Sequence, residues 1–471
     1  MISIDEAFVD SAAPNAAALT KARKLARGGK LLARHQDADG TLIFGECAGS
    51  GKQAYRPSAD FQDPSNPVYR CTCPSRQFPC KHTLALLYAF ASGEAFTVAD
   101  VPEDIAAKRA KQVARAENRK ARAAKPKKVN KRALAKKIDA QLDGLATLET
   151  LLHDLVRSGL GAVTPKTAGV LEKQAKQLGD AYLPGAQYAV RQLANALGGD
   201  ANPETAYDDA IAQLLRITTL CKRGVTYLEA RKADPELTPD TRTPIAAWLG
   251  HAWQLSKLRA LELFEENAEL VQLYFRAYDD LARRERVELG VWLNLKSGAL
   301  QQTLNYRPHR AERFMKEASS FHHVRQTPCL YRYPGETLPR VRWDEASERP
   351  LDPRDLATLR SHALDLSAAI KAAKGRLKDP LYETAFALVR YDQLGRVGDA
   401  TVLQSGDERI VLNDDAGCDP METVALLELV DGALHRNQVA LLAFRPQAGA
   451  HSLHAKPLTL ISEAQIVRLA L

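Results

Sequence analysis

Three cysteines and one histidine lie within twelve positions of the sequence, and their types and spacing are those of a metal site. One residue separates Cys71 from Cys73, and after six further residues Cys80 and His82 repeat that separation. Structural zinc sites in proteins take four ligands, which are thiolate sulfurs or imidazole nitrogens. Three thiolates and one imidazole complete such a set, so we expect a structural zinc site with no position left for a catalytic water.

The spacing of these ligands also predicts the backbone around them. In an extended chain residues i and i+2 point to one side, so Cys71 and Cys73 can converge on one ion from the end of a strand. A helix would separate such residues by about 200°. Cys80 and His82 must therefore lie at the irregular entrance of a helix, which we expect to run through residues 83–90.

Two other interpretations of the cysteines are weaker. Buried free thiols are common in cores, but Cys71 and Cys73 flank a threonine and precede Pro, Ser, Arg and Gln, which is not an apolar run. A disulfide is disfavoured because the N-terminus shows no secretory signal, and thiols inside cells stay reduced. The remaining cysteines are scattered, and we expect each to be a small buried hydrophobe: Cys47, Cys221, Cys329 and Cys418.

The segment from Val68 to Leu86, VYRCTCPSRQFPCKHTLAL, resembles a SWIM-type zinc finger, whose pattern is Cys-x-Cys, a variable gap and then Cys-x-His. The resemblance places zinc on all four of the residues named above and implies a small β-hairpin followed by a helix. The run GECAGSGK at 45–52 is similar to the segment before the finger in a group of bacterial SWIM-domain proteins of largely unknown function. The specific resemblance covers residues 15–92.

The excess positive charge of the chain is concentrated in one segment. Residues 108–137 contain fourteen lysines and arginines against Glu117 alone, a net charge of +13, so the other 441 residues sum to −5. The segment has few large apolar side chains and Pro126 interrupts it, so we expect a partly helical basic linker. It can contact nucleic-acid phosphates, or it can be a solvated tether.

Two functions are compatible with these features. Arg70, Arg76 and Lys81 can give the finger a basic face, which together with the linker 108–137 would bind nucleic acid, DNA in particular. The alternative is a protein-interaction adaptor. The resemblance to bacterial SWIM proteins implies an accessory role beside a MoxR-type AAA+ ATPase and a von Willebrand factor A-domain protein, without DNA binding.

Composition and motifs limit the remaining possibilities. The 471 residues contain no apolar run as long as a membrane-spanning helix, and we expect no membrane contact and a cytoplasmic location. No hydrolase, metalloprotease or dinucleotide fingerprint is present, so we expect a protein that is not an enzyme.

The periodicity of apolar residues predicts an α+β multidomain protein. We expect helices at 15–27, 165–181, 185–198, 204–232 and 353–373, and a helical pattern from Pro244 to Leu281. Val287 to Leu295 alternate with period two, and short strands should follow. The predicted domains are a zinc-stabilised ββα finger domain at 1–95, the basic linker at 96–134, a helical domain at 135–284, and an antiparallel β-rich domain with one or two helices at 285–471.

Overall fold

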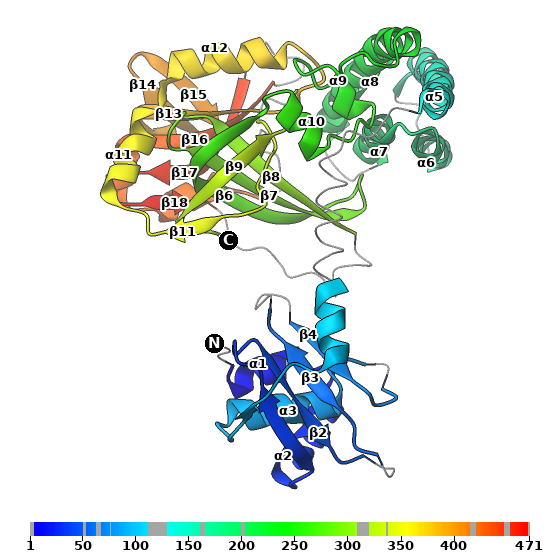
Figure 1. Cartoon of the computed structure of the whole chain (residues 1–471). Coiled ribbons are helices and arrows are strands. Elements are labelled where there is room, and N and C mark those ends of the chain that lie inside the picture. The colour runs from blue at the N-terminus through cyan, green and yellow to red at the C-terminus, as the bar shows by residue number, and fades with distance from the viewer. Residues whose placement is uncertain are drawn as a thin grey trace. The chain divides into compact units, whose positions relative to one another are not determined.

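The computed structural model describes most of the chain, which forms two compact units divided after Arg122 (Figure 1). The described residues are 4–49, 53–62, 67–75, 77–111, 130–160, 165–198, 203–308, 320–335, 338–414, 421–446 and 453–469. Mixed helices and sheets confirm the expected α+β class.

The first unit is built on a five-stranded sheet in the order β4-β3-β2-β1-β5. Its strands are β1 (Leu31–Gln36), β2 (Leu42–Cys47), β3 (Pro57–Asp60), β4 (Val68–Cys71) and β5 (Thr97–Val98). Its helices are α1 (Glu6–Ala12), α2 (Ala16–Arg27) and α3 (Lys81–Ala91), followed by helical residues 103–111. The predicted helix at 15–27 is present as α2, and Asp37–Gly40 form the turn between β1 and β2.

Helix α3 lies at the centre of this unit, between the sheet and helices α1 and α2. Its buried residues, with Ile43 and Ala59 of the sheet, form one apolar core. Because successive strand residues face opposite sides, Ser58 and Asp60 face away from this core. Helical residues 103–111 lie over that other side, where Ile105 is buried.

The second unit begins with a helical region, whose members are α5 (Lys131–Ser158), α6 (Pro165–Asp180), α7 (Pro184–Gly198) and α8 (Pro203–Ala233). Asn130 caps α5 by accepting a hydrogen bond from the Ala133 amide. Leu145, Leu148, Leu152 and Leu155 of α5 are buried in the core of this region. Two short helices follow, α9 (Ile245–Trp248) and α10 (Leu255–Ala260).

A six-stranded antiparallel sheet follows in the order β10-β9-β6-β7-β8, with β11 added on β9. Its strands are β6 (Phe264–Asp280), β7 (Glu285–Asn294), β8 (Leu300–Pro308), β9 (Val324–Arg332), β10 (Val341–Arg342) and β11 (Ser347–Arg349). The alternating residues of β7 divide between two cores: Leu289 and Val291 lie in the larger core, and Trp292 lies in a small aromatic one.

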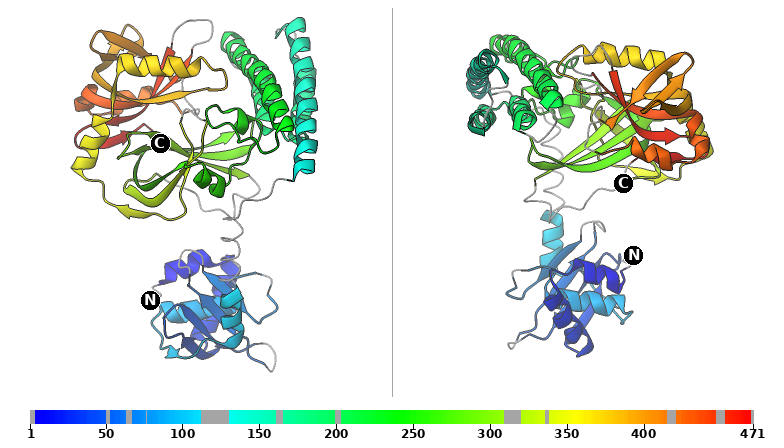
Figure 2. Two further views of the ribbon diagram at one scale, coloured as in Figure 1. Left: turned by 45° about the horizontal axis from the view of Figure 1, so that its top comes forward. Right: turned by 180° about the vertical axis from the view of Figure 1, so that it is seen from behind.

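A second sheet packs against the first through that larger core (Figure 2). Its strands are β12 (Leu364–Asp365), β13 (Ala385–Val397), β14 (Ala400–Ser405), β15 (Glu408–Leu412), β16 (Arg436–Pro446), β17 (Leu453–Ile461) and β18 (Ile466–Arg468). The order β13-β14-β15-β17-β16 closes on itself because β13 also pairs with β16. The associated helices are α11 (Pro353–Ser361), α12 (Leu366–Leu377) and the 3-10 helices η4 (Ala425–Leu429) and η5 (Gly432–His435).

Two secondary-structure predictions are wrong in part. The helical pattern from Pro244 ends at Ala260, and residues 264–280, which we placed in the helical domain, form strand β6. Strand β6 is buried on both faces and has a bulge between Gln272 and Tyr274, so its sequence lacks simple alternation. The helix expected at 353–373 is two helices, because residues 364–365 pair with β13.

The basic linker predicted at 96–134 is shorter than expected at both ends. Residues 97–98 form β5, residues 103–111 are helical, and α5 begins at Lys131. Residues 112–129, its central part, lie outside the described residues. Within the described part of the chain, no helix is long and apolar enough to cross a membrane.

Candidate metal centre

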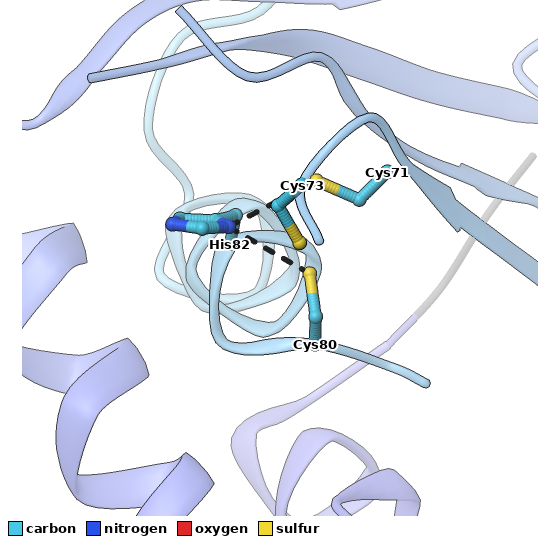
Figure 3. Close-up of side chains that lie close together, drawn as sticks. All are labelled: Cys71, Cys73, Cys80 and His82. Atoms are coloured by element: carbon cyan, nitrogen blue, oxygen red, sulfur yellow. Dashed lines mark hydrogen bonds between the residues drawn. The ribbon is translucent and has the colours of Figure 1, made fainter. Parts of the chain in front are cut away.

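The four predicted zinc ligands lie together in the first unit, with the sulfur and nitrogen atoms of Cys71, Cys73, Cys80 and His82 all within 4.8 Å of one another. Figure 3 shows the three sulfurs and the imidazole pointing toward one another. His82 Nδ1 lies 3.9 Å from Cys71 Sγ and 3.8 Å from Cys80 Sγ. Nδ1, rather than Nε2, is therefore the nitrogen that faces the thiols.

This geometry fits zinc. Tetrahedral Zn²⁺ with bonds of about 2.3 Å to sulfur and about 2.0 Å to nitrogen holds its ligand atoms about 3.5–3.8 Å apart. The two sulfur-to-nitrogen distances are close to that spacing, and Cys73, Cys80 and His82 are buried. Four soft or borderline donors surrounding one point and shielded from water form the ligand set of a structural zinc ion.

The local chain positions each ligand as the spacing predicted. Cys71 is the last residue of β4, and Cys73 lies in the bend that follows. Cys80 is the N-cap of α3, with extended backbone at φ −78° and ψ 169°, and His82 is the second helical residue. The unsatisfied amides at the start of α3 favour negative charge, which stabilises thiolate at Cys80.

Hydroxyl and aromatic groups around the ligands hold them in place. Thr83 Oγ1 donates a hydrogen bond to the Arg70 carbonyl at 3.2 Å and lies 3.5 Å from Cys80 Sγ. Thr72 Oγ1 accepts a hydrogen bond from the Arg56 backbone amide at 2.9 Å. The centroids of the Tyr55 and His82 rings lie 4.8 Å apart.

The sequence analysis did not assign these supporting roles. The contact of Thr83 with Cys80 could have been predicted from the sequence. A residue three positions after a helix N-cap lies on the same side of the helix as the N-cap residue. The contacts of Tyr55 and Thr72 with distant residues carry no local signature.

The thiols of Cys71, Cys73 and Cys80 share one hydrogen-bonded cluster. Hydrogen bonds from Cys71, and then from His82 and Thr83, lower the pKa of the Cys80 thiol despite its burial. The pKa of Cys71 is raised, first by its hydrogen bond with Cys80 and then by burial, and burial raises the pKa of Cys73.

A cleft of about 760 Å³ opens beside the metal centre, and its lining includes Cys73, Cys80 and His82. Lys21 of α2, Lys30 and Lys81 also line it, and all three are exposed. Among the described residues that line this cleft there is no aspartate or glutamate. The cleft therefore combines the zinc ligands with three lysines, whose charge exceeds the single negative charge of a zinc ion bound to three thiolates.

The other residues expected on a basic face are distributed differently. Arg70 lines a separate cavity and forms an ion pair with the buried carboxylate of Asp60 at 3.2 Å. Arg76 lies outside the described residues. Of the two residues that the structure describes, Arg70 and Lys81, only Lys81 therefore lines the cleft beside the metal centre.

Several cations of the basic segment 108–137 contact residues of their own unit. Arg109 binds Asp60 through two nitrogens at 2.8 and 3.0 Å. Burial alone would raise the pKa of Asp60, but the hydrogen bonds from Arg109 outweigh it and the pKa is lowered. At the other end of the segment, Lys131 lies 3.2 Å from Glu236, and the Lys137 ammonium lies over the Tyr182 ring.

The scattered cysteines that the structure describes do not join the metal centre. Cys47 and Cys221 are buried, as expected, whereas Cys329 is half-buried, and Cys418 lies outside the described residues. Among the described residues, one group of histidine, cysteine or carboxylate side chains is arranged to hold a metal ion, and it consists of Cys71, Cys73, Cys80 and His82.

Comparisons with known proteins agree with this geometry. The SWIM zinc finger family model matches residues 63–91, which contain all four ligands. The model of the SWIM-associated four-helix bundle domain matches residues 120–245, which contain helices α5 to α8. A comparison with curated proteins found no match. The metal-binding finger and the helical region that follows it identify the chain as a SWIM-type zinc finger protein.

Proposed function

We propose that this protein is a non-catalytic, cytoplasmic DNA-binding protein in which zinc maintains the fold of the finger. The cleft beside the metal centre is the observation that supports DNA most directly. Lys21, Lys30 and Lys81 line it without a lining carboxylate among the described residues.

The zinc ion has a structural role in this proposal. Three thiolates and one imidazole complete its tetrahedron, whereas catalytic zinc keeps a position for water. Metal binding then contributes directly to the folding free energy of the finger.

The segment between the two units supplies further phosphate contacts. Seven lysines and arginines fall between residues 112 and 129, against Glu117. Arg109, by contrast, is bound to Asp60 and Asp37 and does not count as a phosphate ligand. We therefore assign the electrostatic contribution to two groups: the three lysines of the cleft, and Arg115, Arg119, Lys120, Arg122, Lys125, Lys127 and Lys128.

The salt dependence of binding to a short duplex tests this proposal. Each phosphate neutralised by the protein changes the slope of log K against log salt by about −0.9. Replacing the three cleft lysines by glutamine should flatten the slope by about two to three. The matched control replaces Lys371, Lys374 and Lys378, which are exposed in or next to α12, and should leave the slope nearly unchanged.

A variant with the seven linker cations replaced by glutamine should flatten the slope further. If the full-length protein binds neither duplex nor single strand, or binds them with no salt dependence, the DNA proposal is wrong. The adaptor role beside a MoxR-type AAA+ ATPase and a von Willebrand factor A-domain protein would then be the function to test, by identifying what co-purifies with the full chain.

A further inference from the structure

The first sheet of the second unit curls until its two ends meet. The sheet ends at β10 on one side and β8 on the other. Gln302 of β8 donates its amide hydrogen to the Pro339 carbonyl at 2.9 Å, and its side chain donates to the Leu338 carbonyl at 2.7 Å. These bonds join β8 to the residues before β10. The strands of this sheet are green to yellow in Figures 1 and 2.

The curled sheet contains a cavity of about 560 Å³ lined by residues of β6, β7, β8, β9 and β10. Gly290 of β7 helps to keep it open, because a Cβ atom there would lie 2.6 Å from Thr303 Oγ1 and 2.9 Å from Trp292 Nε1. Mouths of barrel-like sheets are preferred places for small-molecule sites, and this volume is typical of one.

Aromatic rings form one wall of the cavity. Trp292 contacts Trp343 edge to face at 5.4 Å between ring centroids and contacts Phe321 at 5.9 Å. Trp292 is buried and its Nε1 donates to Thr303 Oγ1, whereas Trp343 and Phe321 are half-exposed. The half-exposed rings can stack on a planar ligand, because aromatic stacking works with any π face.

The lining of the cavity also contains three arginines. Arg325, Arg340 and Arg342 line the cavity. Among the described lining residues the one carboxylate is that of Glu288, which lies 2.6 Å from Arg307. Arg325 also contacts Glu348, and Arg342 lies 3.8 Å from Asp344.

Arg340 differs from the other two arginines. Its guanidinium lies over the rings of Tyr306 and Tyr333, and it forms no ion pair among the residues that the structure describes. Contact with aromatic rings leaves the N–H donors of the Arg340 guanidinium available for a phosphate or a carboxylate.

We propose that this cavity binds a nucleotide, with its base against Trp343 and Phe321 and its phosphate on Arg340. A planar ring joined to an anion is the ligand that satisfies the aromatic wall and the arginine together. This site lies in the second unit and is independent of the zinc finger and its proposed function.

Calorimetry and tryptophan fluorescence on the full-length protein test the proposal. AMP, CMP, GMP and UMP are the probes, and adenosine and ribose 5-phosphate are the two halves of the ligand. Nucleotide should quench the fluorescence, since two of the four tryptophans line the cavity. Each half should bind at least about tenfold more weakly than AMP, because it lacks either the stacking or the ionic contact.

Two variants locate the binding. Arg340→Gln should weaken nucleotide binding about tenfold through loss of its charge-assisted bonds, while the matched control Arg396→Gln on the exposed end of β13 should not. Trp343→Leu should weaken adenosine and AMP alike. Urea unfolding of each variant establishes that it is folded.

The source of the nucleotide is a second question for the same experiment. If Arg340→Gln weakens the binding of a single-stranded oligonucleotide about as much as it weakens AMP binding, the cavity takes one nucleotide of a strand. If Arg340→Gln weakens AMP binding alone, the ligand is a free nucleotide. The proposal fails if none of the four nucleotides binds at millimolar concentration, or if folded Arg340→Gln binds them as the unchanged protein does.

Discussion

Arg109 and Asp60 form a two-point ion pair in the N-terminal unit, with Arg109 Nη2 2.8 Å from Asp60 Oδ1 and Nε 3.0 Å from Oδ2. Arg109 also reaches Asp37 at 3.2 Å, and these side chains are only 12%, 3% and 4% exposed. Arg109 belongs to the basic linker by sequence, but its side chain is therefore a structural part of the N-terminal unit, which contains the finger.

Replacing Arg109 by alanine should destabilise the N-terminal unit by about 3 kcal/mol, because buried Asp37 would lose its counter-charge and buried Asp60 would keep only Arg70. Hydrogen exchange followed by mass spectrometry on the full-length protein measures this locally, as faster exchange in β2 and β3. Lys108→Ala is the neighbouring control: its ion pair with Asp104 is about half exposed, and exchange should change little. Equal exchange in the two variants would contradict the structural role of Arg109.

Replacing Thr83 by valine should weaken zinc binding about tenfold while keeping all four ligands. The valine has nearly the same volume but loses the hydroxyl that lies 3.5 Å from Cys80 Sγ and bonds the Arg70 carbonyl. Competition with a chromogenic chelator measures the affinity. Thr97→Val, on strand β5 and outside the metal-site cluster, is the control and should retain the affinity of the unchanged protein. Unchanged affinity in Thr83→Val would show that this hydroxyl does not support the site.

The metal centre could be predicted from the sequence because its ligands lie within twelve residues and their types are specific. Helices with one buried stripe, such as α5, could also be predicted, since their period is visible. Strand β6 could not be, because it is covered on both faces and its bulge shifts the alternation. The ion pair of Arg109 with Asp60 could not be predicted either, because 49 positions separate the two residues.

Adding a methyl group at Gly185 should destabilise the helical region by about 1–3 kcal/mol. A Cβ atom there would lie 2.3 Å from the Trp248 carbonyl oxygen, where α7 meets α9. Gly169→Ala in α6 is the matched control, since a Cβ there meets no atom within 4 Å. That control should stabilise the protein by about 0.5–1 kcal/mol through helix propensity. Urea unfolding compares the two, and destabilisation of the same size in both would contradict the close contact.

Acid should weaken the second unit through Glu269, Asp355 and Arg349. Hydrogen bonds from Arg349 lower the pKa of Glu269, and they lower that of Asp355 against the opposing effect of burial. A carboxyl group with a lower pKa in the folded state adds stability above its unfolded pKa, and that stability is lost as the pH falls from about 4.5. Arg349→Met should therefore flatten the fall in unfolding free energy between pH 6 and pH 3.

Arg396→Met is the control for this pH series, because its ion pair with Glu428 is exposed. The control should show the same pH dependence as the unchanged protein. If Arg349→Met also keeps that dependence, the assignment of the pKa shifts to Arg349 is wrong.

X-ray absorption spectroscopy at the zinc edge of the full-length protein is the most direct test of the metal centre formed by Cys71, Cys73, Cys80 and His82. It should show one zinc per chain with three sulfurs at about 2.3 Å and one nitrogen at about 2.0 Å. Cys71→Ser and His82→Ala should each lose zinc and unfold the N-terminal unit, whereas Cys221→Ser, buried in the helical region, should keep it. Full zinc retention in both ligand variants, or a zinc ion without three sulfur ligands, would contradict this assignment.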